Sequence, residues 1–61
     1  MREYTTLELY RLSRSELLHL EHRMAITAIQ AATFAPERTL AQLNLHRVRH
    51  ELHRREWGLG L

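Results

Sequence analysis

Residues 13–34, SRSELLHLEHRMAITAIQAATF, form the longest amphipathic stretch of the chain. Ser13 and Glu16 have the spacing of a capping box, in which each side chain accepts a hydrogen bond from the other residue's backbone amide at a helix start. At about 100° of rotation per residue, the apolar side chains that follow gather on one stripe, which comprises Leu17, Leu20, Met24, Ala28 and Ala31. The stretch therefore predicts a long helix over residues 14–34.

A second apolar strip lies beside this stripe and comprises Leu18, Ala25, Ile29 and Ala32. Together the two stripes cover roughly half of the helix circumference, whereas a surface helix usually presents an apolar arc of about 100°. One partner helix within the chain covers only one side, so we expect the second strip to be a dimer interface with another copy. The competing interpretation is that part of the arc faces water, because alanine is also a good residue at exposed helical positions.

The partner helix is predicted over residues 37–56. A proline disfavours helical angles in the residue before it and suits the first turn of a helix, so Ala35 and Pro36 separate the two helices. The core stripe of the second helix comprises Ala41, Leu45, Val48 and Leu52, with Leu40 and Leu43 beside it. The short connection predicts an antiparallel helical hairpin.

Two details of the second helix bear on assembly and on its end. Asn44 borders the core stripe, where a polar residue either sets the register across a subunit interface, as in coiled coils, or is simply exposed. Gly58 predicts a left-handed helix stop, after which Leu59 folds back on the last turn. Residues 57–61 are accordingly predicted to be a C-terminal tail.

Residues 1–12 leave two interpretations open. Thr5 and Glu8 have the spacing of a second capping box, which favours a short helix over about residues 6–12. The strand-forming residues Tyr4, Thr5 and Tyr10 favour an extended arm instead. In either form the segment covers one end of the helical pair or reaches a second subunit.

Length and composition limit the architecture and the compartment. A chain of 61 residues forms a single small domain with marginal stability. It has no cysteine, so oligomerisation is the expected source of added stability. No stretch resembles a signal peptide or provides the roughly 20 apolar residues of a membrane span. We therefore expect a soluble, cytoplasmic protein without a membrane partner.

The most basic region is residues 46–56, where Arg47, His50 and Arg54 are the candidate contacts for nucleic acid or an acidic partner. Phosphate binding requires a clustered basic face. Here Glu51 and Glu56 interrupt the basic residues, and the formal charge of the whole chain is only +2. Glutamate–arginine pairs on a solvated face are the simpler expectation, and nucleic-acid binding, if it occurs, is predicted to be weak and independent of sequence.

The histidines of the second helix, His46, His50 and His53, have spacings that permit metal binding. Arg47 stands where the HExxH metalloprotease motif has its glutamate, and no cysteine or aspartate is present to complete a site. We therefore expect no metal, no cofactor and no catalytic residue.

These features predict an all-α fold, a helical hairpin with an N-terminal arm or short helix, that dimerises into a four-helix bundle. The expected function is that of a non-enzymatic, homodimeric protein-interaction or regulatory module with a further protein partner. The alternative is a weak nucleic-acid-binding protein that uses the Arg/His face of the second helix.

Overall fold

The computed structural model describes residues 2–31, 33 and 35–60, and side chains within these ranges up to Glu56. It contains three helices, α1 (Thr6–Arg11), α2 (Arg14–Gln30) and α3 (Pro36–Gly60). No β-strand occurs in the described part of the chain. The prediction of an all-α fold is thereby confirmed.

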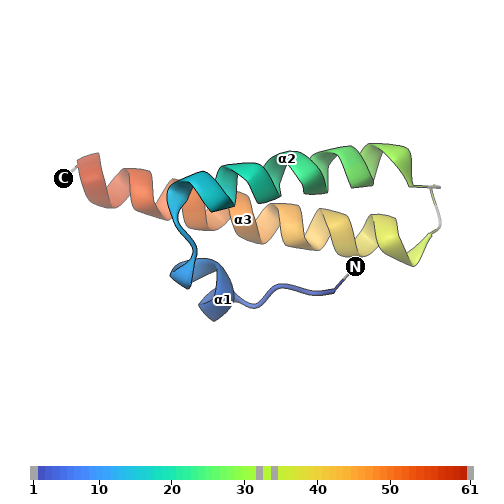
Figure 1. Cartoon of the computed structure of the whole chain (residues 1–61), viewed down its shortest axis with the longest axis horizontal. Coiled ribbons are helices and arrows are strands. Elements are labelled where there is room, and N and C mark those ends of the chain that lie inside the picture. Colours follow the sequence, from blue (N-terminus) through green and yellow to red (C-terminus); the bar gives the residue numbers. More distant parts are fainter. Residues whose placement is uncertain (1, 32, 34, 61) are drawn as a thin grey trace.

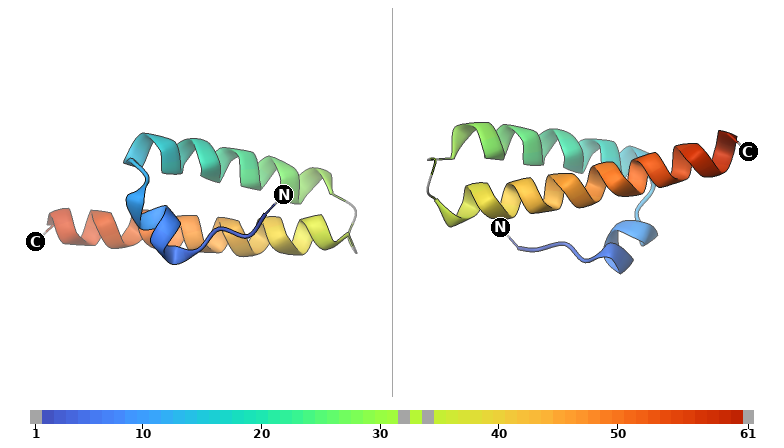
Figure 2. Two further views of the ribbon diagram at one scale, coloured as in Figure 1. Left: turned by 60° about the horizontal axis from the view of Figure 1, so that its bottom comes forward. Right: turned by 180° about the vertical axis from the view of Figure 1, so that it is seen from behind.

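Helices α2 and α3 lie side by side and run in opposite directions, as Figure 1 shows. Residues 2–12 double back along α3, on the side away from most of α2 (Figures 1 and 2). Helix α3 has 25 residues and α2 has 17, or about 37 Å against 26 Å at 1.5 Å per residue. The C-terminal end of α3 consequently projects beyond the start of α2.

The core lies between the two long helices and beneath α1. Its main cluster, among the described side chains, contains one residue of α1, three of α2 and two of α3, namely Leu9, Leu17, Leu20, Met24, Val48 and Leu52. Tyr4, Leu12 and Leu45 pack against this cluster and are partly buried. The stripes predicted for the two long helices therefore face each other, because residues at spacings of three and four share one side of a helix.

Both predicted capping boxes are present. The Ser13 hydroxyl accepts the Glu16 amide at 3.1 Å, and the Glu16 carboxylate accepts the Ser13 amide at 3.1 Å. Thr5 and Glu8 form the same reciprocal pair at the start of α1. The N-terminal segment thus combines the two alternatives left open by the sequence, with extended residues 2–5 followed by a helix.

The prediction that the long helix continues to residue 34 is wrong, since α2 ends at Gln30 and Ala31 is an extended C-cap with ψ 147°. Pro36 fixes the start of α3 because it cannot extend a preceding helix. The residues that reverse the chain direction must therefore come from the end of α2. Predicted helical residues 32 and 34 lie outside the described residues.

The predicted helix stop at Gly58 is also wrong, because α3 continues through Gly58 to Gly60. Among the described residues no glycine has a positive φ. Glycine permits a left-handed stop but also tolerates helical angles at a modest cost. The expected folding back of Leu59 concerns a side chain outside the described ones. Within the described ranges, no helix has the length and apolar character to cross a membrane.

Candidate functional site

The predicted dimer strip lies on an uncovered face of α2. Leu18 and Ile29 expose 41% and 79% of their surface, and Ala25 between them is half-buried. Leu18 and Leu20 point about 160° apart on the helix, and Leu20 is the residue that packs beneath the N-terminal segment. The strip is therefore on the side of α2 that this segment does not cover. Ala32, its fourth predicted residue, lies outside the described residues.

The predicted basic contacts Arg47 and Arg54 are engaged inside the chain. Arg47 Nη1 donates to a Glu3 carboxylate oxygen and to the carbonyl oxygen of Tyr4, each at 2.8 Å. Arg54 forms a bidentate pair with Glu51, at 3.3 Å through Nε and 2.6 Å through Nη2. His50 is exposed beside them. The structure places all three predicted residues on one face, but these arginine contacts weaken the case for a phosphate-binding surface.

Sequence reasoning missed the role of Arg55, which lies beneath the end of α1. Its Nη2 lies 3.2, 2.9 and 2.7 Å from the carbonyl oxygens of Leu9, Tyr10 and Leu12, to which it donates. The last carbonyls of a helix have no partner within the helix, and a cation there also matches the negative end of the helix dipole. Arg55 therefore anchors the end of α1 to α3.

Glu51 joins Arg54 and Arg55 into one network, and it is nearly inaccessible to solvent. Its Oε2 accepts Arg55 Nε at 2.8 Å in addition to Arg54. The hydrogen bond from Arg54 lowers the pKa of Glu51 below its ordinary value of 4.5, burial opposes this shift, and Arg55 adds to it. A buried carboxylate without such partners would be strongly disfavoured, so the pairs keep Glu51 ionised.

Asn44 is fully buried, which corrects both expectations for it, exposure and pairing across a subunit interface. Its Oδ1 accepts the Tyr4 amide and its Nδ2 donates to the Arg2 carbonyl, both at 2.9 Å. The amide side chain thus bonds the extended segment as a neighbouring strand's backbone would. The position of Asn44 beside the core stripe indicated a special role, but its partners lie 40 and 42 positions away in the sequence and could not be identified from it.

The histidines do not assemble into a metal site in the described part of the chain, where no group of three His, Asp or Glu side chains is placed to hold an ion. His46 and His50 line a hollow of about 230 Å³ between α1 and α3, together with Thr6, Leu9, Arg47 and Glu51. This hollow brings two of the histidines next to α1.

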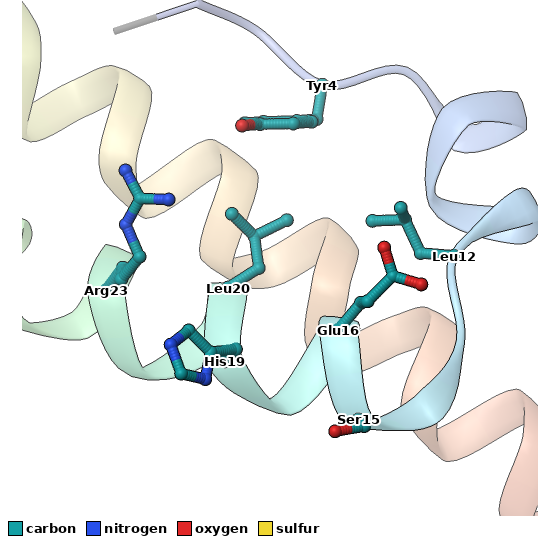
Figure 3. A pocket seen from close by; sticks show the side chains of 7 residues that line it. All are labelled: Tyr4, Leu12, Ser15, Glu16, His19, Leu20 and Arg23. Carbon is teal, nitrogen blue, oxygen red and sulfur yellow. The ribbon is translucent and has the colours of Figure 1, made fainter.

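A second hollow of about 310 Å³ lies beside the N-terminal segment (Figure 3). The ring of Tyr4 covers Leu20, with Leu12 at one end and Arg23 at the other. Glu16 borders it, but one of its carboxylate oxygens already accepts the Ser13 amide. His19 and Ser15 lie at its rim. The nearby Ser13 is the N-cap of α2, and its hydroxyl accepts a hydrogen bond from the Glu16 amide.

Comparisons of this chain with protein-family models, with curated proteins and with solved structures find no match.

Proposed function

We propose that this chain is a non-enzymatic, cytoplasmic protein-interaction module that acts as a homodimer. The uncovered strip on α2 carries the proposal: Ile29 is 79% exposed and Leu18 41% exposed on a helix whose opposite side is packed. Burial of apolar surface contributes about 25 cal/mol per Å². A domain of this size gains from such burial because its own core is small.

A two-fold contact between two α2 helices is the simplest assembly. The same strip then serves both copies, and small Ala25 at its middle allows the helices to approach closely. A stable interface buries about 800 Å² per subunit, which is roughly a sixth of the 4671 Å² surface of this chain. Two hairpins joined in this way form a four-helix bundle.

The test is Ile29→Glu, which places a charge on the most exposed residue of the strip. We expect the parent to have the mass of a dimer and a melting temperature that rises with protein concentration, and the variant to be a monomer whose melting temperature does not. Light scattering after size exclusion gives the mass, and thermal melts over a concentration series give the second quantity.

Gln30→Glu is the matched control, because it adds the same charge one position away on the exposed polar face of α2. It should remain a dimer. A monomeric parent at tens of micromolar, with a melt independent of concentration, would refute the homodimer. Equal loss of mass in both variants would mean that charge near the end of α2, rather than this strip, controls association.

A further inference from the structure

A second exposed surface lies on the other side of the hairpin, over α1 and the adjoining side of α3. Leu7 and Tyr10 are 58% and 61% exposed, and their spacing of three places them on one side of α1. Arg54 lies over Tyr10, 5.4 Å from the ring centroid. Leu43, Arg47, His50 and Arg54 form one stripe of α3, because they follow each other at spacings of four, three and four.

The net formal charge of the chain comes from residues in and around this surface. Residues 2–12 contain two arginines, Arg2 and Arg11, and two glutamates, Glu3 and Glu8. Three arginines of α3 contact this segment, namely Arg47, Arg54 and Arg55, and Glu51 pairs with two of them. The group therefore has five arginines and three glutamates. The remaining four arginines and four glutamates of the chain cancel. This group of residues therefore has a formal excess of two positive charges, equal to that of the whole chain, whereas the α2 strip is uncharged.

We propose that this surface, defined by Leu7, Tyr10, Leu43, Arg47, His50 and Arg54, binds an acidic amphipathic helix of a partner protein. The inference names the partner class for the interaction module proposed above and rests on that function. Apolar residues of the partner cover Leu7 and Tyr10, and its carboxylates meet the cations of the α3 stripe. The hollow of about 230 Å³ between α1 and α3 receives a side chain of the partner.

The geometry favours a helix over an extended peptide. An extended peptide needs backbone partners, usually a free strand edge, and the described part of the chain contains no strand. A helix satisfies its own backbone and requires only side-chain contacts. Arg54 remains available for such a contact, since its pair with Glu51 uses Nε and Nη2 and leaves Nη1 for a further acceptor.

The same geometry disfavours nucleic acid as the occupant. Nucleic acid is bound through several cations that contact phosphates, and only two arginines, Arg47 and Arg54, belong to this surface. Phosphate contacts would also leave the exposed apolar side chains of Leu7 and Tyr10 without a partner. A helix with carboxylates and leucines uses both parts of the surface.

The experiment measures fluorescence anisotropy of a labelled peptide of about 18 residues, five helical turns, with leucines at i, i+3, i+4 and i+7 and glutamates elsewhere. A peptide of the same composition in scrambled order, a peptide with lysine for glutamate, and a single-stranded oligonucleotide are the comparison probes. We expect the acidic amphipathic peptide to bind more tightly than all three.

Leu7→Glu should weaken the acidic peptide about tenfold or more, the size of effect seen for one central interface residue. It removes an apolar contact and repels the peptide, and a carboxylate in the first turn of α1 is compatible with its dipole. Tyr10→Ala tests the same surface without a new charge. Gln30→Glu is the control, because it adds the same charge at an exposed position outside both surfaces, and it should retain the parent's affinity.

The outcomes separate this surface from the dimer. Loss of peptide binding in Leu7→Glu with an unchanged mass and circular dichroism supports the inference, even where the parent is a monomer. Equal binding of the scrambled or lysine peptide, tighter binding of the oligonucleotide, or unchanged affinity in both Leu7→Glu and Tyr10→Ala would overturn it. Loss of mass in Ile29→Glu bears on the homodimer alone.

Discussion

The two sides of the hairpin are built from different kinds of residue. On one side, residues 2–12 cover α3 and are held by buried or half-buried polar groups, namely Asn44, Arg47, Glu51 and Arg55. On the other side, α2 presents Leu18, Ala25 and Ile29, which carry no polar group, and Leu18 and Ile29 are exposed. The same pair of helices thus supports a polar contact and an apolar strip.

This difference in residue type follows from how far the backbone that packs on each side satisfies its own hydrogen bonds. An extended segment and the end of a short helix leave amides and carbonyls without partners, and these groups must be satisfied when they are buried. Asn44, Arg47 and Arg55 supply the missing partners. A complete helix satisfies its own backbone, so a contact between two helices can be made by apolar side chains alone.

Replacing Asn44 by leucine should have the largest effect on stability. The change leaves two groups without partners, the Tyr4 amide and the Arg2 carbonyl, and each buried polar group left unsatisfied costs about 1–3 kcal/mol. We expect the extended residues to detach while α2 and α3 remain paired, with faster hydrogen exchange at the Tyr4 amide. This loss should not depend on protein concentration, unlike the loss expected from Ile29→Glu.

Gln42→Leu is the control, since Gln42 is an exposed polar residue of the same helix and its replacement should change stability by no more than about 0.5 kcal/mol. If the Tyr4 amide exchanges as slowly in Asn44→Leu as in the parent, the attachment of residues 2–5 to α3 does not depend on Asn44.

Arg55→Met should have the next largest effect, because methionine fills similar space but donates no hydrogen bond. The carbonyls of Leu9, Tyr10 and Leu12 lose their cation, and hydrogen bonds from charged groups are worth about 1.5–3 kcal/mol. Chemical denaturation measures the change in the free energy of unfolding. Arg49→Met is the control, since Arg49 pairs with Glu21 at an exposed position, where such pairs contribute about 0–1 kcal/mol. Equal losses would show that α1 is not anchored through Arg55.

These residues also mark how far the sequence alone could predict the structure. Helix starts, the facing core stripes and the uncovered strip depend on spacings within one helix, and the pairs Ser13–Glu16 and Thr5–Glu8 were correctly predicted. The roles of Asn44 and Arg55 depend on where residues 2–12 run, and their partners lie 40 or more positions away. Periodicity contains no information on such a path.

The errors at helix ends have a related cause. Helix α2 ends at Gln30 because several residues are needed to reverse the chain before α3 begins at Pro36. This requirement depends on the placement of both helices, so a single helix pattern does not contain it. Gly58 lies within α3 although its residue type is typical of a stop. Local signals give the start of a helix, where caps are specific, better than its end, where several conformations satisfy the same residues.

Acidification should weaken the polar side before the apolar one. The folded-state pKa of Glu51 is lowered, so its contribution is present above the ordinary value of 4.5 and is lost as pH falls through the lower folded value. Glu51→Gln removes this dependence. Glu8 and Glu16 also have lowered pKa values, so the informative quantity is the difference between parent and variant melting temperatures from about pH 6 to pH 3. A difference that stays constant over this range would show that Glu51 does not contribute through its charge.

Zinc should produce the smallest effect, because the described residues on either side of the hairpin do not provide a complete ligand set. His46 and His50 are four positions apart on α3, a spacing that allows two imidazoles to reach one ion, but structural zinc sites use four ligands. Arg47 follows His46 directly, and Arg54 lies one helical turn after His50. Both arginines repel a cation. We expect zinc to bind no more tightly than about micromolar, or about −8 kcal/mol, in a calorimetric titration at neutral pH. Stoichiometric nanomolar binding that disappears when His46, His50 and His53 are all changed to alanine would contradict this prediction, since a tight site would then require ligands from a second copy placed next to α3.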